Sequence, residues 1–160
     1  MLLLLLAACG PTDGEGTTGG AAADYASPPG AVLDLVPAGQ GKSGQVSTLS
    51  VTDATWDWED PQGQTSSWPW AVGADGLTVN GELILPARTG PGSSGAGVSV
   101  TDNGATEVYY GTFDDTVTVE IDAGSFAGTA VFARGLGPVV LTLSGVPMEL
   151  AYYQGVVIGE

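Results

Sequence analysis

The stretch Thr116–Asp122, TVTVEID, is the clearest β-strand pattern in the sequence. Its apolar side chains alternate, so that Val117, Val119 and Ile121 project to one face while threonines and acidic residues project to the other. Alternation with a period of two is typical of a strand that has one face in the core and one in water. The stretch therefore predicts an amphipathic strand, and the same pattern can be sought along the rest of the chain.

Similar runs recur throughout residues 31–160. They are rich in β-branched and aromatic residues and are separated by Gly, Pro, Asp and Ser, and no stretch shows a sustained apolar repeat at helical spacing. We expect strands at residues 31–36, 45–52, 54–59, 66–71, 77–85, 97–102, 106–112, 116–122, 126–133, 138–144 and 147–158. Many short antiparallel strands predict a single all-β domain, an antiparallel β-sandwich in the first place and a small β-barrel as the alternative.

The segment LTVNGELIL, Leu77–Leu85, has two readings as strand structure. Asn80-Gly81 is a typical two-residue hairpin turn, but that turn would set Glu82 beside Val79 on an apolar face. A continuous strand keeps the carboxylate off that face. We therefore expect one unbroken strand with a bulge or a close backbone approach at Gly81.

The final strand is expected to alternate without interruption. In PMELAYYQ, Pro147–Gln154, the side chains of Met148, Leu150 and Tyr152 fall on one face of a regular strand. Tyr153 falls on the opposite face, because successive side chains of a strand point to opposite sides.

All four tryptophans lie in the stretch TWDWEDPQGQTSSWPW, residues 55–70: Trp56, Trp58, Trp68 and Trp70. We expect an antiparallel hairpin centred on Gly63. In that register Trp56 lies opposite Trp70, and Trp58 lies opposite Trp68, as cross-strand aromatic pairs. Because Pro69 has no N–H to offer a further strand, the second arm is expected at a sheet edge.

The orientation of these indoles decides their role. Aromatic side chains usually cover a hydrophobic core, and we favour that interpretation here. The alternative is an exposed aromatic platform on which sugar rings stack, with carboxylates and amides of the hairpin loop as hydrogen-bond partners. The candidate ligand-binding residues on that alternative are Trp56, Trp58, Trp68, Trp70, Glu59 and Asp60.

The charge balance is strongly acidic. The chain has 3 Lys and Arg residues against 18 Asp and Glu residues, which gives a formal net charge of −15. Nucleic acids are bound through clustered basic residues. Lys42, Arg88 and Arg134 are isolated from one another in the sequence, so we expect no nucleic-acid partner.

Residue types needed for common catalytic machinery are missing. The chain has no His, which excludes Ser-His-Asp and Cys-His catalysis and the usual His-containing zinc sites. The G-x-S-x-G hydrolase motif and the D-x-D-x-D-G calcium loop do not occur, so we expect no enzyme activity and no cofactor, with Ca²⁺ left open as a ligand that no motif supports. A glycan hydrolase that needs only two carboxylates is a further alternative, although each acid is more simply explained as a solvated group on a strand face. The available acids are Glu82, Glu107, Glu120 and Glu149.

The chain opens with MLLLLLAACG, in which Leu2–Ala8 are apolar. Seven residues are far fewer than the roughly 20 that cross a bilayer as a helix, whereas a short apolar run before small residues is typical of a secretion signal. The tetrad Leu6-Ala7-Ala8-Cys9 resembles the lipobox of bacterial lipoproteins. The resemblance implies cleavage of residues 1–8 and acylation of Cys9, which is the only cysteine. No basic residue precedes the leucines, and we expect such residues upstream in the gene.

The residues that follow the cysteine predict a linker. Residues 10–30 contain no Val, Leu, Ile, Phe or Trp, so they have too little apolar surface to offset the entropy of ordering. We expect a flexible, disordered tether over residues 9–30 and a β domain over residues 31–160. In the lipoprotein family, a residue other than Asp after the cysteine is compatible with export to the outer membrane, and Gly10 has that place here.

These observations predict an acidic lipoprotein that is anchored in a bacterial cell envelope, at the outer membrane. Its β-sandwich is expected to be a non-catalytic structural or interaction module, with an envelope protein or a glycan as partner. A carbohydrate-binding module built on the four tryptophans is the first alternative. A carboxylate-dependent glycan hydrolase is the second.

Overall fold

The computed structural model describes residues 20–154. Cys9, the signal segment and residues 9–19 of the expected tether lie outside the described residues. The described chain contains two short 3₁₀ helices, η1 (Ala22–Tyr25) and η2 (Gly41–Ser43). Its strands are β1 (Val32–Pro37), β2 (Ser47–Val51), β3 (Thr55–Glu59), β4 (Thr65–Gly73), β5 (Gly76–Val79), β6 (Glu82–Pro86), β7 (Ser94–Gly95), β8 (Val98–Val108), β9 (Gly111–Ile121), β10 (Gly128–Ala133), β11 (Gly137–Leu143) and β12 (Val146–Gln154).

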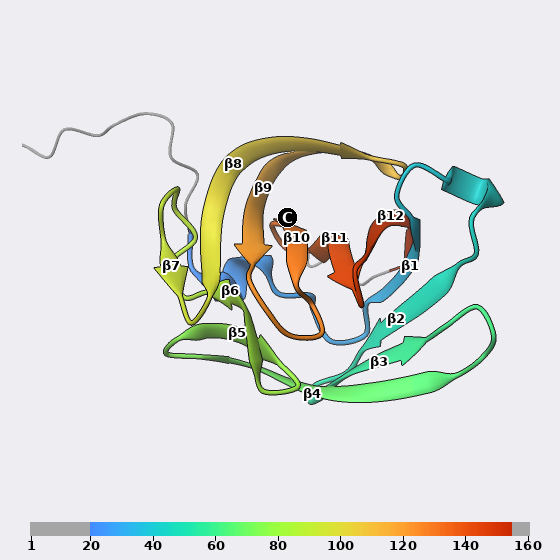
Figure 1. Ribbon diagram of the computed structural model, residues 1–160, viewed down its shortest axis with the longest axis horizontal. Coiled ribbons are helices and arrows are strands. Elements are labelled where there is room, and N and C mark those ends of the chain that lie inside the picture. The colour runs from blue at the N-terminus through green and yellow to red at the C-terminus, as the bar shows by residue number, and fades with distance from the viewer. Residues whose placement is uncertain (1–19, 155–160) are drawn as a thin grey trace, which may run out of the picture.

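Residues 20–154 form one twelve-stranded antiparallel sheet, which confirms the all-β prediction. The strand order is β6-β5-β4-β3-β2-β1-β12-β11-β10-β9-β8-β7, so neighbours in the sequence are neighbours in the sheet, and β1 and β12 join the two halves. The sheet curls until its ends meet, and β6 packs against β7 and β8 without a hydrogen-bonded ladder in the described chain (Figure 1). The result is a nearly closed, barrel-like sheet.

Residues 116–121 of the stretch TVTVEID form the C-terminal half of β9. Val117 and Val119 are fully buried and Ile121 is almost so, whereas Thr118 and Glu120 between them are only half-buried. Burying a side chain of this size contributes about 1.5–3 kcal/mol. The alternation therefore turns one face of β9 into the core, which fills the inside of the curled sheet.

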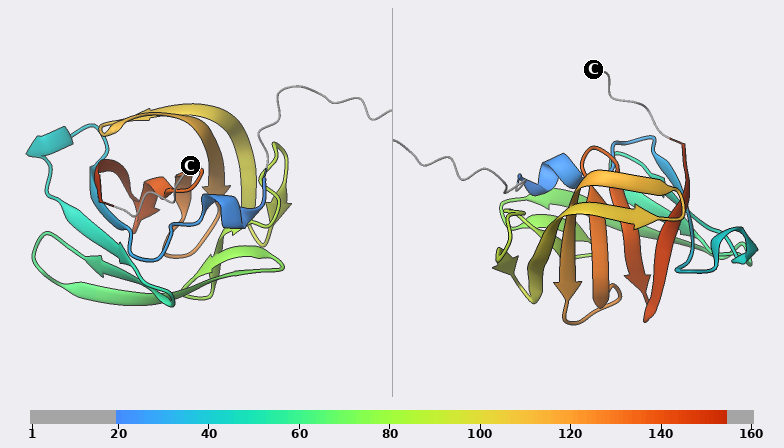
Figure 2. Two further views of the ribbon diagram at one scale, coloured as in Figure 1. Left: turned by 180° about the vertical axis from the view of Figure 1, so that it is seen from behind. Right: turned by 90° about the horizontal axis from the view of Figure 1, so that it is seen from above.

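The hairpin of β8 and β9, which we call the arch, extends past the rest of the sheet. β9 pairs with β10 only over Thr116–Ile121, and residues 111–115 continue with β8 alone. Register shifts in the β8–β9 ladder are the kind of irregularity that bends a strand pair. The arch curves across β10, β11 and β12, as Figure 2 shows, and at its tip the Tyr110 N–H donates to the carbonyl of Leu150 at 3.0 Å.

The folded body begins earlier than expected. Residues 20–30 were predicted to be part of a disordered tether, but Ala22 is 2% exposed and Tyr25 is fully buried. The backbone of this segment pairs with the chain after β6, through an antiparallel bridge between Ala21 and Arg88. The prediction was wrong for these residues because the absence of aliphatic side chains hid the contribution of one aromatic ring, Tyr25.

The Asn80-Gly81 pair forms a hairpin, so the prediction of one continuous strand was wrong. Both residues have positive φ, 52° and 76°, as a type I′ turn requires, and Val79 pairs directly with Glu82. The carboxylate of Glu82 accepts hydrogen bonds from the backbone N–H and the hydroxyl of Ser125. The acid that argued against the turn is therefore satisfied by a distant loop.

The last strand does not alternate without interruption. Asp34 pairs with Tyr152 and Leu35 with Leu150, which leaves Ala151 as an extra residue in β12. One extra residue exchanges the faces of everything beyond it. Tyr152 is therefore exposed, although Met148 and Leu150 before it are buried, and Tyr153 packs partly against the core instead.

Residues 20–154 include no helix that is both long enough and apolar enough to cross a membrane.

Candidate functional site

The four tryptophans lie on β3 and β4, but their register differs from the one expected. Trp56 pairs with Trp68, and Trp58 pairs with Ser66. The hairpin loop consists of residues 60–64, and within it the Asp60 carboxylate accepts the N–H groups of Gln62 and Gln64, at 2.9 and 2.8 Å. These bonds centre the loop one residue before Gly63 and move every cross-strand pair.

The four indoles belong to the inner face of the sheet. Trp56 is fully buried, and Trp58, Trp68 and Trp70 are partly buried and pack against the core. Trp58 and Trp68 stack with ring centroids 6.1 Å apart, and Phe126, from the loop between β9 and β10, meets Trp68 edge-on at 5.5 Å. Trp70 donates its indole N–H to the carbonyl of Thr52. This packing supports the core interpretation, because a ligand cannot reach Trp56 in this structure.

The acidic candidates of the same hairpin do not join the indoles. Asp60 is engaged in holding the loop, and Glu59 lies on the strand face opposite to Trp56 and Trp58. The second arm, β4, was expected at a sheet edge but lies between β3 and β5: residues 65–68 pair only with β3, the Pro69 carbonyl accepts the Asn80 N–H, and residues 70–73 pair with β5. The predicted set therefore does not form one site.

The four candidate catalytic acids are also separated. The Glu82 carboxylate binds Ser125, and the Glu120 carboxylate accepts the hydroxyl of Thr129. Glu107 and Glu149 alone among the four line one groove. No cluster of three or more Asp, Glu, Cys or His side chains within residues 20–154 is arranged to hold a metal ion.

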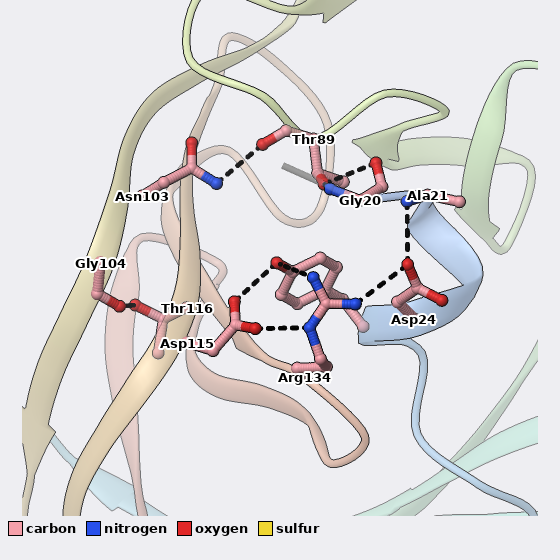
Figure 3. A network of polar contacts seen from close by, with 10 residues as sticks. Gly20, Ala21, Asp24, Thr89, Asn103, Gly104, Asp115, Thr116 and Arg134 are labelled. Carbon is pink, nitrogen blue, oxygen red and sulfur yellow. Dashed lines mark hydrogen bonds and ion pairs between the residues drawn. The ribbon is translucent and has the colours of Figure 1, made fainter. Parts of the chain in front are cut away.

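A polar network, which we call the Arg134 clamp, fastens the N-terminal segment to the barrel (Figure 3). The Arg134 guanidinium pairs with Asp115 and, at 3.1 Å, with Asp24. The Tyr25 hydroxyl donates to Asp115 at 2.8 Å and accepts an N–H of Arg134 at 3.1 Å. Burial and the neighbouring Asp115 raise the pKa of the Tyr25 phenol, and the hydrogen bond to Asp115 raises the pKa of Arg134. The contacts of Asp24 and Tyr25 join the segment around η1 to β9 and to the turn after β10, and the Arg134–Asp115 pair links these two elements to each other, so the clamp is a structural device.

Aromatic side chains gather instead at the tip of the arch and the end of β12. Tyr109, Tyr110 and Tyr152 are 44%, 46% and 55% exposed, and Phe113 and Tyr153 are partly buried and pack against the core. Tyr110 and Phe113 stack, with centroids 6.1 Å apart and planes 13° from parallel. Burial, with a contribution from Tyr110, raises the pKa of Tyr153. We call these five residues the tyrosine surface.

Sequence reasoning missed the tyrosine surface, although a signal was present. Tyr109-Tyr110 and Tyr152-Tyr153 are consecutive aromatic pairs within predicted strands. Neighbouring side chains in a strand point to opposite faces, so each pair must direct one ring away from the core. Four of the five tyrosines in the chain belong to these two pairs.

Two of the grooves on the surface of the described chain contain charged side chains that bear on function. One, of about 690 Å³, lies between the β5–β6 hairpin and β7, and Asp75 and Arg88 line it. Arg88 makes no ion pair with any carboxylate of residues 20–154. The other, of about 440 Å³, lies beside the arch tip and includes Tyr109, Glu107 and Glu149.

No protein-family model, curated protein or solved structure matches the chain. The chemistry of these surfaces is therefore what indicates a function.

Proposed function

We propose that this chain is a lipid-anchored protein of a bacterial cell envelope, placed at the outer membrane, and that its β domain is a non-catalytic interaction module. The tyrosine surface is its contact site. The anchor is supported by Leu6-Ala7-Ala8-Cys9, since a diacyl or triacyl modification of Cys9 holds a protein stably on a bilayer.

The observation that carries the contact site is that Tyr109 and Tyr110 at the tip of the arch, and Tyr152 in the strand that the tip contacts, are each exposed. Large apolar rings that gather in water mark binding surfaces, and tyrosine is enriched among the residues that dominate binding energy. Each of the four tryptophans, by contrast, is used in packing the domain itself.

The position of the N-terminal segment leaves the same surface free. In Figures 1 and 2 the blue helical turn η1 lies apart from the tip of the arch, although Tyr25 of η1 reaches Asp115 on the arch itself. A lipid on Cys9 would therefore hold the chain by an end that is separate from the tip of the arch.

The residue types of the chain and the contacts of Glu149 support a non-catalytic domain. The chain lacks His, and lipid modification would consume its one thiol. The two carboxylate oxygens of Glu149 accept backbone N–H groups, one from Gly39 at 2.7 Å and one from Tyr109 at 3.2 Å. An acid held in this way serves to brace the arch.

Two measurements in the native host test the proposal. Intact mass of the protein extracted from membranes is expected to show loss of residues 1–8 and acylation, both abolished by Cys9→Ser. A photo-crosslinking residue at position 152 is expected to capture an envelope partner, whereas the same residue at position 72, on β4 and also exposed, is not. An unmodified Cys9 refutes the anchor, and equal capture at both positions refutes the contact site.

A further inference from the structure

We propose that the groove beside the arch tip binds an uncharged glycan, with the Tyr109 ring as the stacking platform. This inference rests on the proposed function, because it gives a ligand class to one part of the tyrosine surface. The groove has a volume of about 440 Å³, and the residues used here are Gly39, Gln40, Gly41, Glu107, Tyr109 and Glu149.

The Tyr109 ring is held in place before any ligand arrives. A Cβ atom at Gly41 would lie 2.7 Å from Cε2 and 3.0 Å from Cδ2 of that ring, so the ring rests directly on the glycine backbone. Gly41 also has φ of +51°, a conformation that favours glycine. The Tyr109 N–H is bonded to Glu149, while nearly half of the residue stays in contact with solvent. A fixed ring with an open side loses little entropy on binding.

The polar groups around the ring suit hydroxyl-rich ligands. Gln40 and Glu107 are both exposed and line the groove. An amide supplies donors and an acceptor, and a carboxylate supplies acceptors only, which together match sugar hydroxyls. The apolar C–H face of a pyranose ring would lie against Tyr109, as apolar groups pack on an aromatic face. Glu149 takes no part, because its oxygens brace Gly39 and Tyr109.

Charge and size select among ligand classes. Glu107 and Glu149 make the groove acidic in a chain of net charge −15, so an anionic glycan would be repelled. The volume falls within the roughly 300–1,000 Å³ of small-ligand sites. A protein partner would need a broad complementary surface of about 800 Å² per side, which a groove around one ring does not supply. An uncharged oligosaccharide meets both conditions.

Calorimetry on the full mature chain in detergent micelles tests the proposal, with cellohexaose, xylohexaose and hexa-N-acetylchitohexaose as probes. At least one probe is expected to bind to the wild type. Tyr109→Ala is expected to weaken that binding at least tenfold, the loss typical of a central aromatic contact, while Tyr109→Phe retains it within about threefold. Gly41→Ala is expected to weaken it as well, because the added Cβ displaces the ring. Tyr152→Ala, on the same surface but outside the groove, is the matched control and is expected to bind normally.

Several results would overturn the inference. These are no binding of any probe to the wild type, binding that Tyr109→Ala leaves unchanged, and equal losses for Tyr109→Ala and Tyr152→Ala. Thermal melting of each variant separates lost binding from lost folding. Cross-linking at position 152 reports on the proposed function independently. If cross-linking at position 152 succeeds but no glycan binds, the glycan proposal is refuted and the proposed contact site stands. If the protein that is cross-linked at position 152 is no longer captured in the Tyr109→Ala variant, the groove binds a protein partner instead.

Discussion

Replacement of Arg134 by methionine is expected to lower the free energy of unfolding by about 2–3 kcal/mol. Methionine keeps much of the length of the side chain and removes the guanidinium. The change deletes three main contacts: the charged hydrogen bond to Asp115, the ion pair with Asp24 and the cation–π contact with Tyr25, whose ring centre lies 4.8 Å from the guanidinium carbon. It also removes the longer hydrogen bond to the Tyr25 hydroxyl, at 3.1 Å.

The magnitude follows from these three contacts. A hydrogen bond to a charged group contributes about 1.5–3 kcal/mol, and we take the lower end because Arg134 and Asp115 are 39% and 33% exposed. The more exposed pair with Asp24 adds about 0.5 kcal/mol. The cation–π contact adds about 0.5–1 kcal/mol.

Urea denaturation of the full chain, followed by tryptophan fluorescence, measures the loss as a lower midpoint at unchanged slope. Arg88→Met is the matched control, because it removes the same charge from a residue that makes no ion pair within residues 20–154, and it is expected to cost less than about 0.5 kcal/mol. A double-mutant cycle of Arg134→Met with Asp115→Asn is expected to give a coupling of at least about 1 kcal/mol. Equal effects of the two arginine substitutions, or no coupling, would refute the clamp as a source of stability.

Three further outcomes can be measured on the same chain. Gly81→Ala is expected to lower the free energy of unfolding, measured by urea denaturation, by about 1–2 kcal/mol, because the φ of Gly81 is +76°. Gly73→Ala is the control and is expected to lower it little, since Gly73 has open space around it and no positive φ. Similar losses for the two variants would contradict the type I′ turn. The raised pKa of Tyr25 means that the folded state favours the neutral phenol, so the stability that this phenol contributes is complete below about pH 10 and is lost as the pH rises further. Tyr25→Phe is expected to flatten the fall in melting temperature at alkaline pH. An unchanged profile would show that Tyr25 does not cause that fall. A chain that starts at residue 31 is expected to melt at a lower temperature than one that starts at Gly20, since it lacks the buried Tyr25, and equal melting temperatures would show that the segment is dispensable.

Local patterns predicted the strands well, and distant contacts decided where the predictions failed. The alternation holds over Val117–Asp122 because burial on one face is a property of the strand itself, whereas Thr116, expected on the polar face, is buried as well. The Asn80-Gly81 turn was rejected because of Glu82, whose partner Ser125 is 43 residues away in the sequence. No local rule reveals such a partner.

Single-residue events account for the other differences. One extra residue in β12, Ala151, exchanged the faces of Tyr152 and Tyr153. One side chain, Asp60, shifted the tryptophan hairpin through its two backbone hydrogen bonds. Register depends on such details because a strand repeats every two residues.

The candidate site was harder to predict than the fold. The position of Tyr109 and Tyr110 depends on a tertiary contact, because the arch curves across the sheet until its tip is hydrogen-bonded to β12. Their adjacency in the sequence shows only that one ring must point outward. It does not show that the rings from β8–β9 and β12 meet.

The pairing of β1 with β12 has a kinetic consequence. Within the described chain, the other strand ladders join segments close in sequence, and such hairpins form within microseconds. The ladder between Val32–Pro37 and residues 148–154 must wait until nearly the whole polypeptide is available. A chain that emerges from a ribosome or a translocation pore N-terminus first therefore holds β1 without its second neighbour until the last strand arrives. During that interval the unpaired edge of β1 is open to other chains, and chaperone protection should matter most then.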